Sequence, residues 1–147
     1  MCLATQIYAQ NPAKGFETDF IAQRKIFNTI VLKGGVKQTK QATLNAFKSE
    51  NANVSISKYK KSNRFLMASP VVGLAGGYLA YKNLKGTPKI YYDATSGKAY
   101  PYKTRSIKKV VLGLGLFATG VCLMEMSNDL KVKSIKLYQQ KKLERAG

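Results

Sequence analysis

At 147 residues, the chain has room for one domain or for a short membrane hairpin with flanking segments. Its net charge is +18, from 25 Lys and Arg against 7 Asp and Glu, which favours an anionic partner, either a membrane surface or RNA. It has no histidine and only two cysteines, Cys2 and Cys122, so the usual general base, the commonest metal ligand and a disulfide framework are missing. We therefore predict that the chain is not an enzyme and has no catalytic, cofactor or metal site.

Residues 1–64 are predicted to form a basic, N-terminal amphipathic helical region. In residues 16–33 the apolar side chains fall close to one face of a helix that would end at Gly34 and Gly35: Phe16, Phe20, Phe27, Ile30 and Val31. This helix could pack on a partner, or lie in the headgroup layer of a membrane with its aromatic side chains down. A second, weaker helix is predicted from Val36 to about Lys48, with Leu44 and Phe47 facing inward.

Two uncharged runs follow, separated by basic segments. The first is FLMASPVVGLAGGYLAY, residues 65–81, preceded by a polar connector over residues 49–64 that ends in a basic cluster. Its seventeen residues would be about 26 Å long as a helix, which predicts a transmembrane helix at the short end of the usual range. The second run, VVLGLGLFATGVCLM, begins the transmembrane helix predicted over residues 110–126. Both runs could instead be helices buried in a large soluble assembly.

The segment between the runs, residues 82–109, is predicted to be a basic, Tyr-rich loop. The sequence KIYYDATSGKAYPY within it is typical of a β-hairpin whose arms join across DATSG, with Gly97 at a positive-φ position. Residues 127–147 continue at helical spacing, so a single helix from about Ser106 to Glu144 is predicted, whose basic C-terminal part projects into solvent.

Small residues recur within both runs. Helices in lipid associate through close backbone approach, which small side chains allow. We therefore predict that the two runs pack as an antiparallel hairpin, or against helices of a larger complex, through ten positions: Ser69, Gly73, Gly76, Gly77, Ala80, Gly113, Gly115, Ala118, Thr119 and Gly120.

Basic residues flank both runs and could contact anionic lipids such as cardiolipin, since such headgroups attract Lys and Arg by about 1 kcal/mol each. The alternative is an ordinary solvated basic face. The residues concerned are Lys58, Lys60, Lys61, Arg64, Lys82, Lys85, Lys108 and Lys109. Basic residues are slightly more numerous near the two ends than in the loop, so both termini are expected on the inner, matrix side of the membrane.

Together these elements predict a mainly α fold: a two-span transmembrane helical hairpin with N-terminal amphipathic helices, a β-hairpin-like loop and a basic C-terminal helical extension. In size, banded charge and Gly-rich spans, the chain resembles the small accessory subunits of mitochondrial respiratory and ATP synthase complexes. The resemblance is to a class and carries over no functional residue. It implies a non-catalytic subunit of the mitochondrial inner membrane that packs against other membrane subunits and binds no nucleic acid. Two alternatives remain: a basic RNA-contacting subunit of an organellar ribosome or other ribonucleoprotein, and a self-associating hairpin that shapes or permeabilises membranes.

Overall fold

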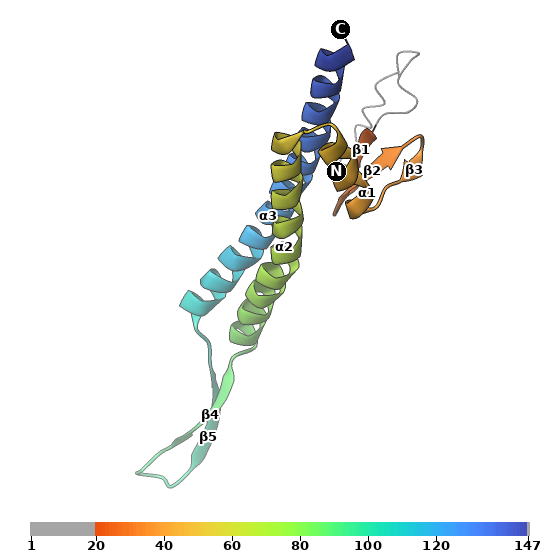
Figure 1. The fold of residues 1–147 in the computed structure, drawn as a ribbon. Coiled ribbons are helices and arrows are strands. Elements are labelled where there is room, and N and C mark those ends of the chain that lie inside the picture. Colours follow the sequence, from red (N-terminus) through yellow and green to blue (C-terminus); the bar gives the residue numbers. More distant parts are fainter. Residues whose placement is uncertain (1–19, 147) are drawn as a thin grey trace, which may run out of the picture.

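The computed structural model describes residues 20–146 and is mainly helical (Figure 1). Three helices, α1 (Lys40–Ser49), α2 (Asn53–Lys85) and α3 (Ile107–Ala146), are accompanied by five strands. The strands β1 (Phe20–Arg24), β2 (Thr29–Lys33) and β3 (Val36–Lys37) form one antiparallel sheet in that order. The other two, β4 (Thr87–Tyr92) and β5 (Ala99–Thr104), form a separate hairpin.

The helices α2 and α3 lie side by side along most of their length and run antiparallel (Figure 1). At one end the three-stranded sheet and α1 pack against them, and at the other end the β4–β5 hairpin projects away (Figure 1). We call the first end the head (β1 to β3, α1, residues 53–64 and residues 125–146). The stem is the remainder of the two helices, residues 65–85 and residues 107–124.

The head has a conventional aromatic core. Phe47 lies at its centre and is fully buried, with its ring 5.0 Å from that of Tyr138 and 5.8 Å from that of Tyr59, measured between centroids. Phe20 on β1 packs edge-on against Tyr138 at 5.5 Å. These four side chains come from β1 and from all three helices, so the core joins the sheet to the three helices.

The prediction of an amphipathic helix over residues 16–33 is wrong. Residues 20–33 form β1 and β2, paired from Phe20 opposite Lys33 to Arg24 opposite Thr29, while residues 16–19 lie outside the described part. Thr29 and Val31 are buried and their neighbours are more exposed, so the period is two and not the helical 3.6. The β-branched residues of TIVLK favour a strand, and Gly34 and Gly35, both at positive φ, turn the chain into β3.

The prediction of a second helix is confirmed, but its start is not. The helix α1 begins at Lys40 and not at Val36. The Thr39 hydroxyl accepts a hydrogen bond from the Ala42 amide at 3.1 Å and so caps its N-terminus. Leu44 and Phe47 face inward as predicted.

The polar connector predicted over residues 49–64 is also wrong for most of its length, because α2 begins at Asn53. Residues 65–81 are therefore the middle of a 33-residue helix. Pro70 lies in the interior of this helix on an exposed face, so α2 continues without the backbone hydrogen bond that an amide at this position would have made.

The β-hairpin predicted between the runs is confirmed. The Asp93 amide donates to the Lys98 carbonyl at 3.0 Å at the base of the turn, and Gly97 has φ of 63°. Pro88 and Pro101 occupy positions whose amides point away from the partner strand, so each free edge lacks one donor for strand pairing. The long helix predicted from Ser106 to Glu144 is observed as α3.

Candidate functional site

The contact between α2 and α3 in the stem is made by glycine, alanine and serine. A Cβ atom added to Gly120 would lie 2.7 Å from the Cα of Gly73, and one added to Gly113 would lie 2.7 Å from the carbonyl oxygen of Gly76. No larger residue fits at either glycine of α3 unless the helices move apart. The Ser69 hydroxyl donates to the Gly120 carbonyl at 2.8 Å, which links the two backbones directly.

The small residues continue into the head at intervals of seven. On α2 they are Ser55, Ser62, Ser69 and Gly76, and on α3 they are Gly113, Gly120, Ser127 and Ser134. All eight are buried, and the Ser127 hydroxyl donates to the Ser62 carbonyl at 2.8 Å. A strict repeat of seven favours the left-handed supercoil in which two helices keep one seam facing each other. We call these eight residues the small-residue ladder.

Six of the ten predicted packing residues lie together in this contact: Ser69, Gly73, Gly76, Ala80, Gly113 and Gly120. Gly77 lies at its margin, where an added Cβ would meet the Phe117 ring at 3.7 Å. The other three, Gly115, Ala118 and Thr119, are exposed on α3, and an added Cβ on Gly115 would have no atom within 4 Å. The Thr119 hydroxyl donates to the Gly115 carbonyl within the helix.

Ser55, Ser62, Ser127 and Ser134 were not among the predicted packing residues, because they lie outside the two uncharged runs. Their spacing of seven from Ser69, Gly76, Gly113 and Gly120 is the signal in the sequence that relates them to the packing contact.

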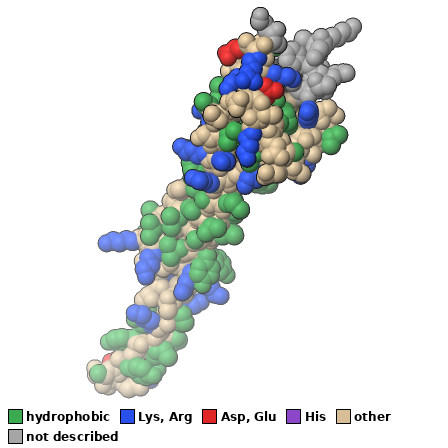
Figure 2. All heavy atoms as spheres, viewed as in Figure 1, with side chains coloured by type: hydrophobic (Ala, Val, Ile, Leu, Met, Phe, Trp, Pro, Cys, Tyr) green, Lys and Arg blue, Asp and Glu red, His purple; other side chains and the backbone are tan. Residues whose placement is uncertain are grey.

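The large apolar side chains of the stem point outward. Figure 2 shows hydrophobic side chains along the stem between the head and the β4–β5 hairpin. The exposed fractions reach 75% at Leu74 and 74% at Met67, so these side chains have little contact with the rest of the described chain. We call the exposed set the apolar belt: Met67, Val71, Leu74, Tyr78, Tyr81, Val111, Leu112, Leu114, Leu116, Phe117 and Val121.

By length and composition, α3 is the one helix within residues 20–146 that could cross a membrane. Only 17% of its most apolar stretch is buried inside the protein, unlike the core helix of a soluble protein. The helix α2 has no stretch of comparable length that is apolar enough. The predicted two-span hairpin is therefore not confirmed.

Basic residues border the apolar belt at both ends. Seven of the eight predicted lipid-contacting residues are exposed and Lys58 is half-buried. The antiparallel pairing places Gly113 beside Ala80 and Ser127 beside Ser62, so Lys109 lies near the level of Lys82, and Glu125 near that of Arg64. The uncharged stretches of the two helices thus begin and end at matching levels.

Two acidic residues of α3, at the border between the stem and the head, form ion pairs with a residue of β1. The Arg24 guanidinium forms ion pairs with Glu125 and, at 3.5 Å, with Asp129. Lys131, two residues after Asp129, turns inward and does not pair with these carboxylates. Its ammonium donates to the Asn28 side-chain oxygen at 2.9 Å and to the Thr29 carbonyl at 3.1 Å. Burial lowers the pKa of this ammonium below its ordinary value.

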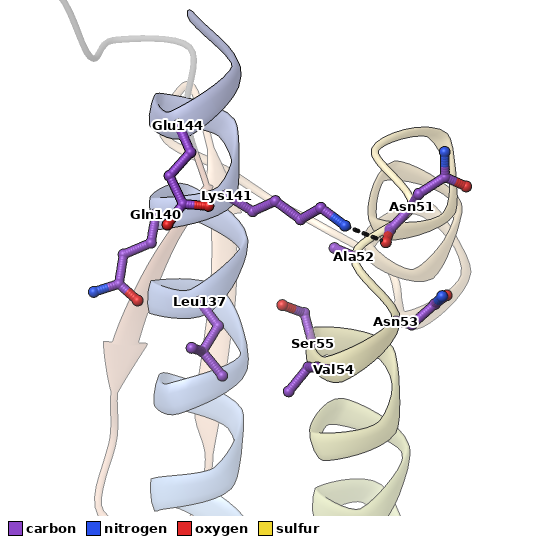
Figure 3. A pocket seen from close by; sticks show the side chains of 9 residues that line it. All are labelled: Asn51, Ala52, Asn53, Val54, Ser55, Leu137, Gln140, Lys141 and Glu144. Atoms are coloured by element: carbon purple, nitrogen blue, oxygen red, sulfur yellow. Dashed lines mark hydrogen bonds between the residues drawn. The ribbon is translucent and has the colours of Figure 1, made fainter. Parts of the chain in front are cut away.

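The far end of the head contains an open cavity of about 320 Å³ between the first turn of α2 and the last turns of α3 (Figure 3). Figure 3 shows the Lys141 side chain crossing it, and the Lys141 ammonium donates to the Asn51 carbonyl at 2.6 Å. This contact ties α3 to the turn between α1 and α2, so the charged group is engaged in the fold. Within residues 20–146 no cluster of three metal-binding side chains is present.

Comparisons with protein-family models, with curated proteins and with solved structures give no significant match to this chain.

Proposed function

We propose that the chain is a non-catalytic membrane subunit that inserts α2 and α3 in a bilayer and stabilises a larger assembly by helix packing and lipid contacts. One observation carries the proposal: the stem has its small residues inside and its large apolar residues outside. We further propose the mitochondrial inner membrane as its location and a respiratory or ATP synthase complex as the assembly, with the head on the matrix side.

The arrangement of the stem, with its large apolar side chains outside, has an unfavourable free energy in water and a favourable one in lipid. Apolar surface exposed to water costs roughly 25 cal/mol per Å², and soluble monomers rarely expose large contiguous apolar patches. In a bilayer this cost disappears, and helix association depends on close packing and on hydrogen bonds between helices. The Gly120–Gly73 approach and the Ser69 hydrogen bond to Gly120 supply both.

The basic borders support contact with anionic lipid. The uncharged stretch between Arg64 and Lys82 is about 26 Å long on a helix axis, somewhat less than a hydrocarbon core of about 30 Å. Long Lys and Arg side chains at both ends can reach outward to the headgroups and make up the difference. Cardiolipin, which is doubly anionic, suits this arrangement.

The small, exposed residues on the outer face of α3 favour contact with a helix of another subunit. Gly115, Ala118 and Thr119 are exposed and small, so another transmembrane helix could approach the α3 backbone there. A subunit that packs in this way needs no catalytic group.

A second candidate function is favoured by the β4–β5 hairpin. All but one of the residues in its two strands are exposed, and Tyr91, Tyr92, Tyr100 and Tyr102 lie among lysines with a single acidic residue, Asp93, in the turn. Exposed tyrosines and positive charge could bind single-stranded RNA by stacking and charge attraction, as a ribonucleoprotein subunit would.

The test is alkaline carbonate extraction of membranes that carry the protein at native levels, followed by native-gel separation in mild detergent. We expect the protein in the pellet and then in a large complex. In the variant Leu74→Lys, a charge at mid-belt should cost about 3 kcal/mol of insertion and lower the retained fraction. Leu143→Lys in the head is the matched control and should extract like the wild type. Recovery of the wild type in the supernatant together with RNA would overturn the membrane proposal in favour of the second function.

A further inference from the structure

The turn between β1 and β2 exposes two large apolar side chains side by side. Ile26 is 74% exposed and Phe27 is 69% exposed, at the tip of a turn closed by the Lys25 amide, which donates to the Asn28 carbonyl at 2.8 Å. These side chains are not part of the head core, which gathers around Phe47. Their exposure therefore calls for a partner.

The orientation of β1 directs this turn toward the apolar belt. At the start of the strand, the Phe20 carbonyl accepts a hydrogen bond from the Gln139 side chain at 2.7 Å. At its end, Arg24 pairs with Glu125, the first charged residue after the apolar part of α3. The strand thus runs along α3 from the far part of the head to the border of the stem, and the turn follows Arg24 at that border.

The turn is also held firmly in this place. The Lys131 ammonium bonds to the Asn28 side chain and to the Thr29 carbonyl, and the Thr29 hydroxyl donates to the Asn128 side chain at 3.1 Å. Together with the Arg24 ion pairs, these contacts attach both ends of the turn to α3. The tip is therefore a fixed apolar projection at one level of the molecule.

We propose that Ile26 and Phe27 insert into the interfacial layer of the bilayer and anchor the head on the membrane surface. The inference rests on the proposed function, since the bilayer that surrounds the belt would end at the level of the turn. An aromatic ring and a branched aliphatic side chain suit the boundary between acyl chains and headgroups, and the adjacent Lys25 can reach the phosphates. The turn then sets how deeply the stem sits and how the head is oriented on the surface.

The chain contains no tryptophan, so a single substitution introduces a unique fluorescent probe. We would place Phe27→Trp in the full-length protein, reconstitute it in phosphatidylcholine and cardiolipin vesicles, and measure quenching by lipids brominated at shallow or deep acyl positions. Leu74→Trp marks the middle of the belt. Val36→Trp is the matched control, because Val36 is equally exposed, at 66%, and follows the opposite end of β2.

We expect a blue-shifted Phe27→Trp emission that shallow bromines quench several-fold more than the Val36→Trp emission. Leu74→Trp should be quenched best by deep bromines. If Leu74→Trp is quenched and Phe27→Trp behaves like Val36→Trp, the inference is overturned while the proposed function stands, and the turn faces water or a protein. If Leu74→Trp is itself unquenched, the proposed function fails and the inference with it.

Discussion

The head and the stem are built from the same two helices but follow opposite rules. In the head, α2 and α3 contribute Tyr59, Ile135 and Tyr138 to a core that excludes water, and every charged side chain except that of Lys131 is at least partly exposed. In the stem, the same helices place glycine and serine between them and Leu74 on the surface. One continuous line of small residues holds α2 and α3 together in both regions. The side chains that face outward differ between the two regions, which indicates that head and stem are adapted to different surroundings.

The small-residue ladder itself changes along the seam. In the stem it consists mainly of glycine, which lets the two backbones approach, while in the head it consists of serine. The Ser69 hydroxyl bonded to Gly120 marks the transition. The serines keep the spacing close, and the Ser127 hydroxyl also donates to the Ser62 carbonyl of the facing helix, whereas the Ser134 hydroxyl donates to the Lys131 carbonyl of its own helix.

The largest expected effect comes from removing one phenyl ring from each region. Phe47→Ala opens a cavity in the aromatic core and should lower the free energy of unfolding by about 3–5 kcal/mol. Phe117→Ala removes the same ring from the exposed belt, where its loss should change stability by less than about 0.5 kcal/mol. Urea unfolding of both variants in one detergent, followed by circular dichroism, measures the difference. Equal losses would mean that the belt is covered by protein and that the comparison is wrong.

The next effect separates the inner and outer faces of α3. Gly120→Leu places a side chain against the backbone of Gly73 and should destabilise the hairpin by about 1–3 kcal/mol. Gly115→Leu adds the same atoms where nothing lies within 4 Å, so the isolated protein should unfold like the wild type. Thermal unfolding in micelles compares the two. A loss of the native complex with Gly115→Leu alone would identify the outer face as the site of a partner helix.

The elements that could be predicted from the sequence are those whose signals are local. The β-hairpin follows from its turn residues and aromatic arms, and the length of α3 follows from sustained helical spacing up to Glu144. The inward positions of Leu44 and Phe47 follow from their period. In each of these three cases, the preference of the local sequence agrees with the structure that the whole chain adopts.

The elements that were missed depend on contacts distant in sequence. Residues 20–33 satisfy both a helical and a strand pattern, and the strand is favoured because Phe20 packs on Tyr138 and Arg24 reaches Glu125. The first three turns of α2 are rich in Asn and Ser, which have weak helix propensity, so they read as a connector. They are helical because Ser55, Ser62 and Tyr59 are buried in the head. Most of the stability of helices in proteins comes from such tertiary packing.

A smaller effect should follow from removing single hydroxyls of the ladder. Ser127→Ala in the head and Ser69→Ala at the stem each delete one hydrogen bond between the helices, and each should cost about 0.5–1.5 kcal/mol. Ser49→Ala is the control, because its hydroxyl bonds within α1 and is exposed, so its loss should have almost no effect. Unfolding curves of the three variants test this order. A Ser127→Ala variant as stable as Ser49→Ala would show that the seam depends on close packing alone.

The smallest effect is a pH dependence carried by Lys131. Because burial lowers the pKa of its ammonium from 10.5, the unfolded chain binds more protons than the folded one between the lowered pKa and 10.5. The free energy of unfolding contributed by this group therefore rises as pH increases through that interval, and the penalty for burying the charge is fully present below it. Tyr59 acts in the opposite direction, since burial raises its pKa, and only the unfolded chain ionises near pH 10.

Substitution of Lys131 isolates its contribution, because the Tyr59 contribution is common to all variants. In unfolding curves recorded from pH 7 to 10.5, we expect the free energy of unfolding of the wild type to rise relative to that of Lys131→Met as pH increases. Lys133→Met removes the same formal charge from an exposed position two residues away and should retain this relative rise. If the wild type and Lys131→Met curves remain parallel, the ammonium is solvated in solution, and the contacts that attach the β1–β2 turn to α3 are looser than the Asn28 and Thr29 distances indicate.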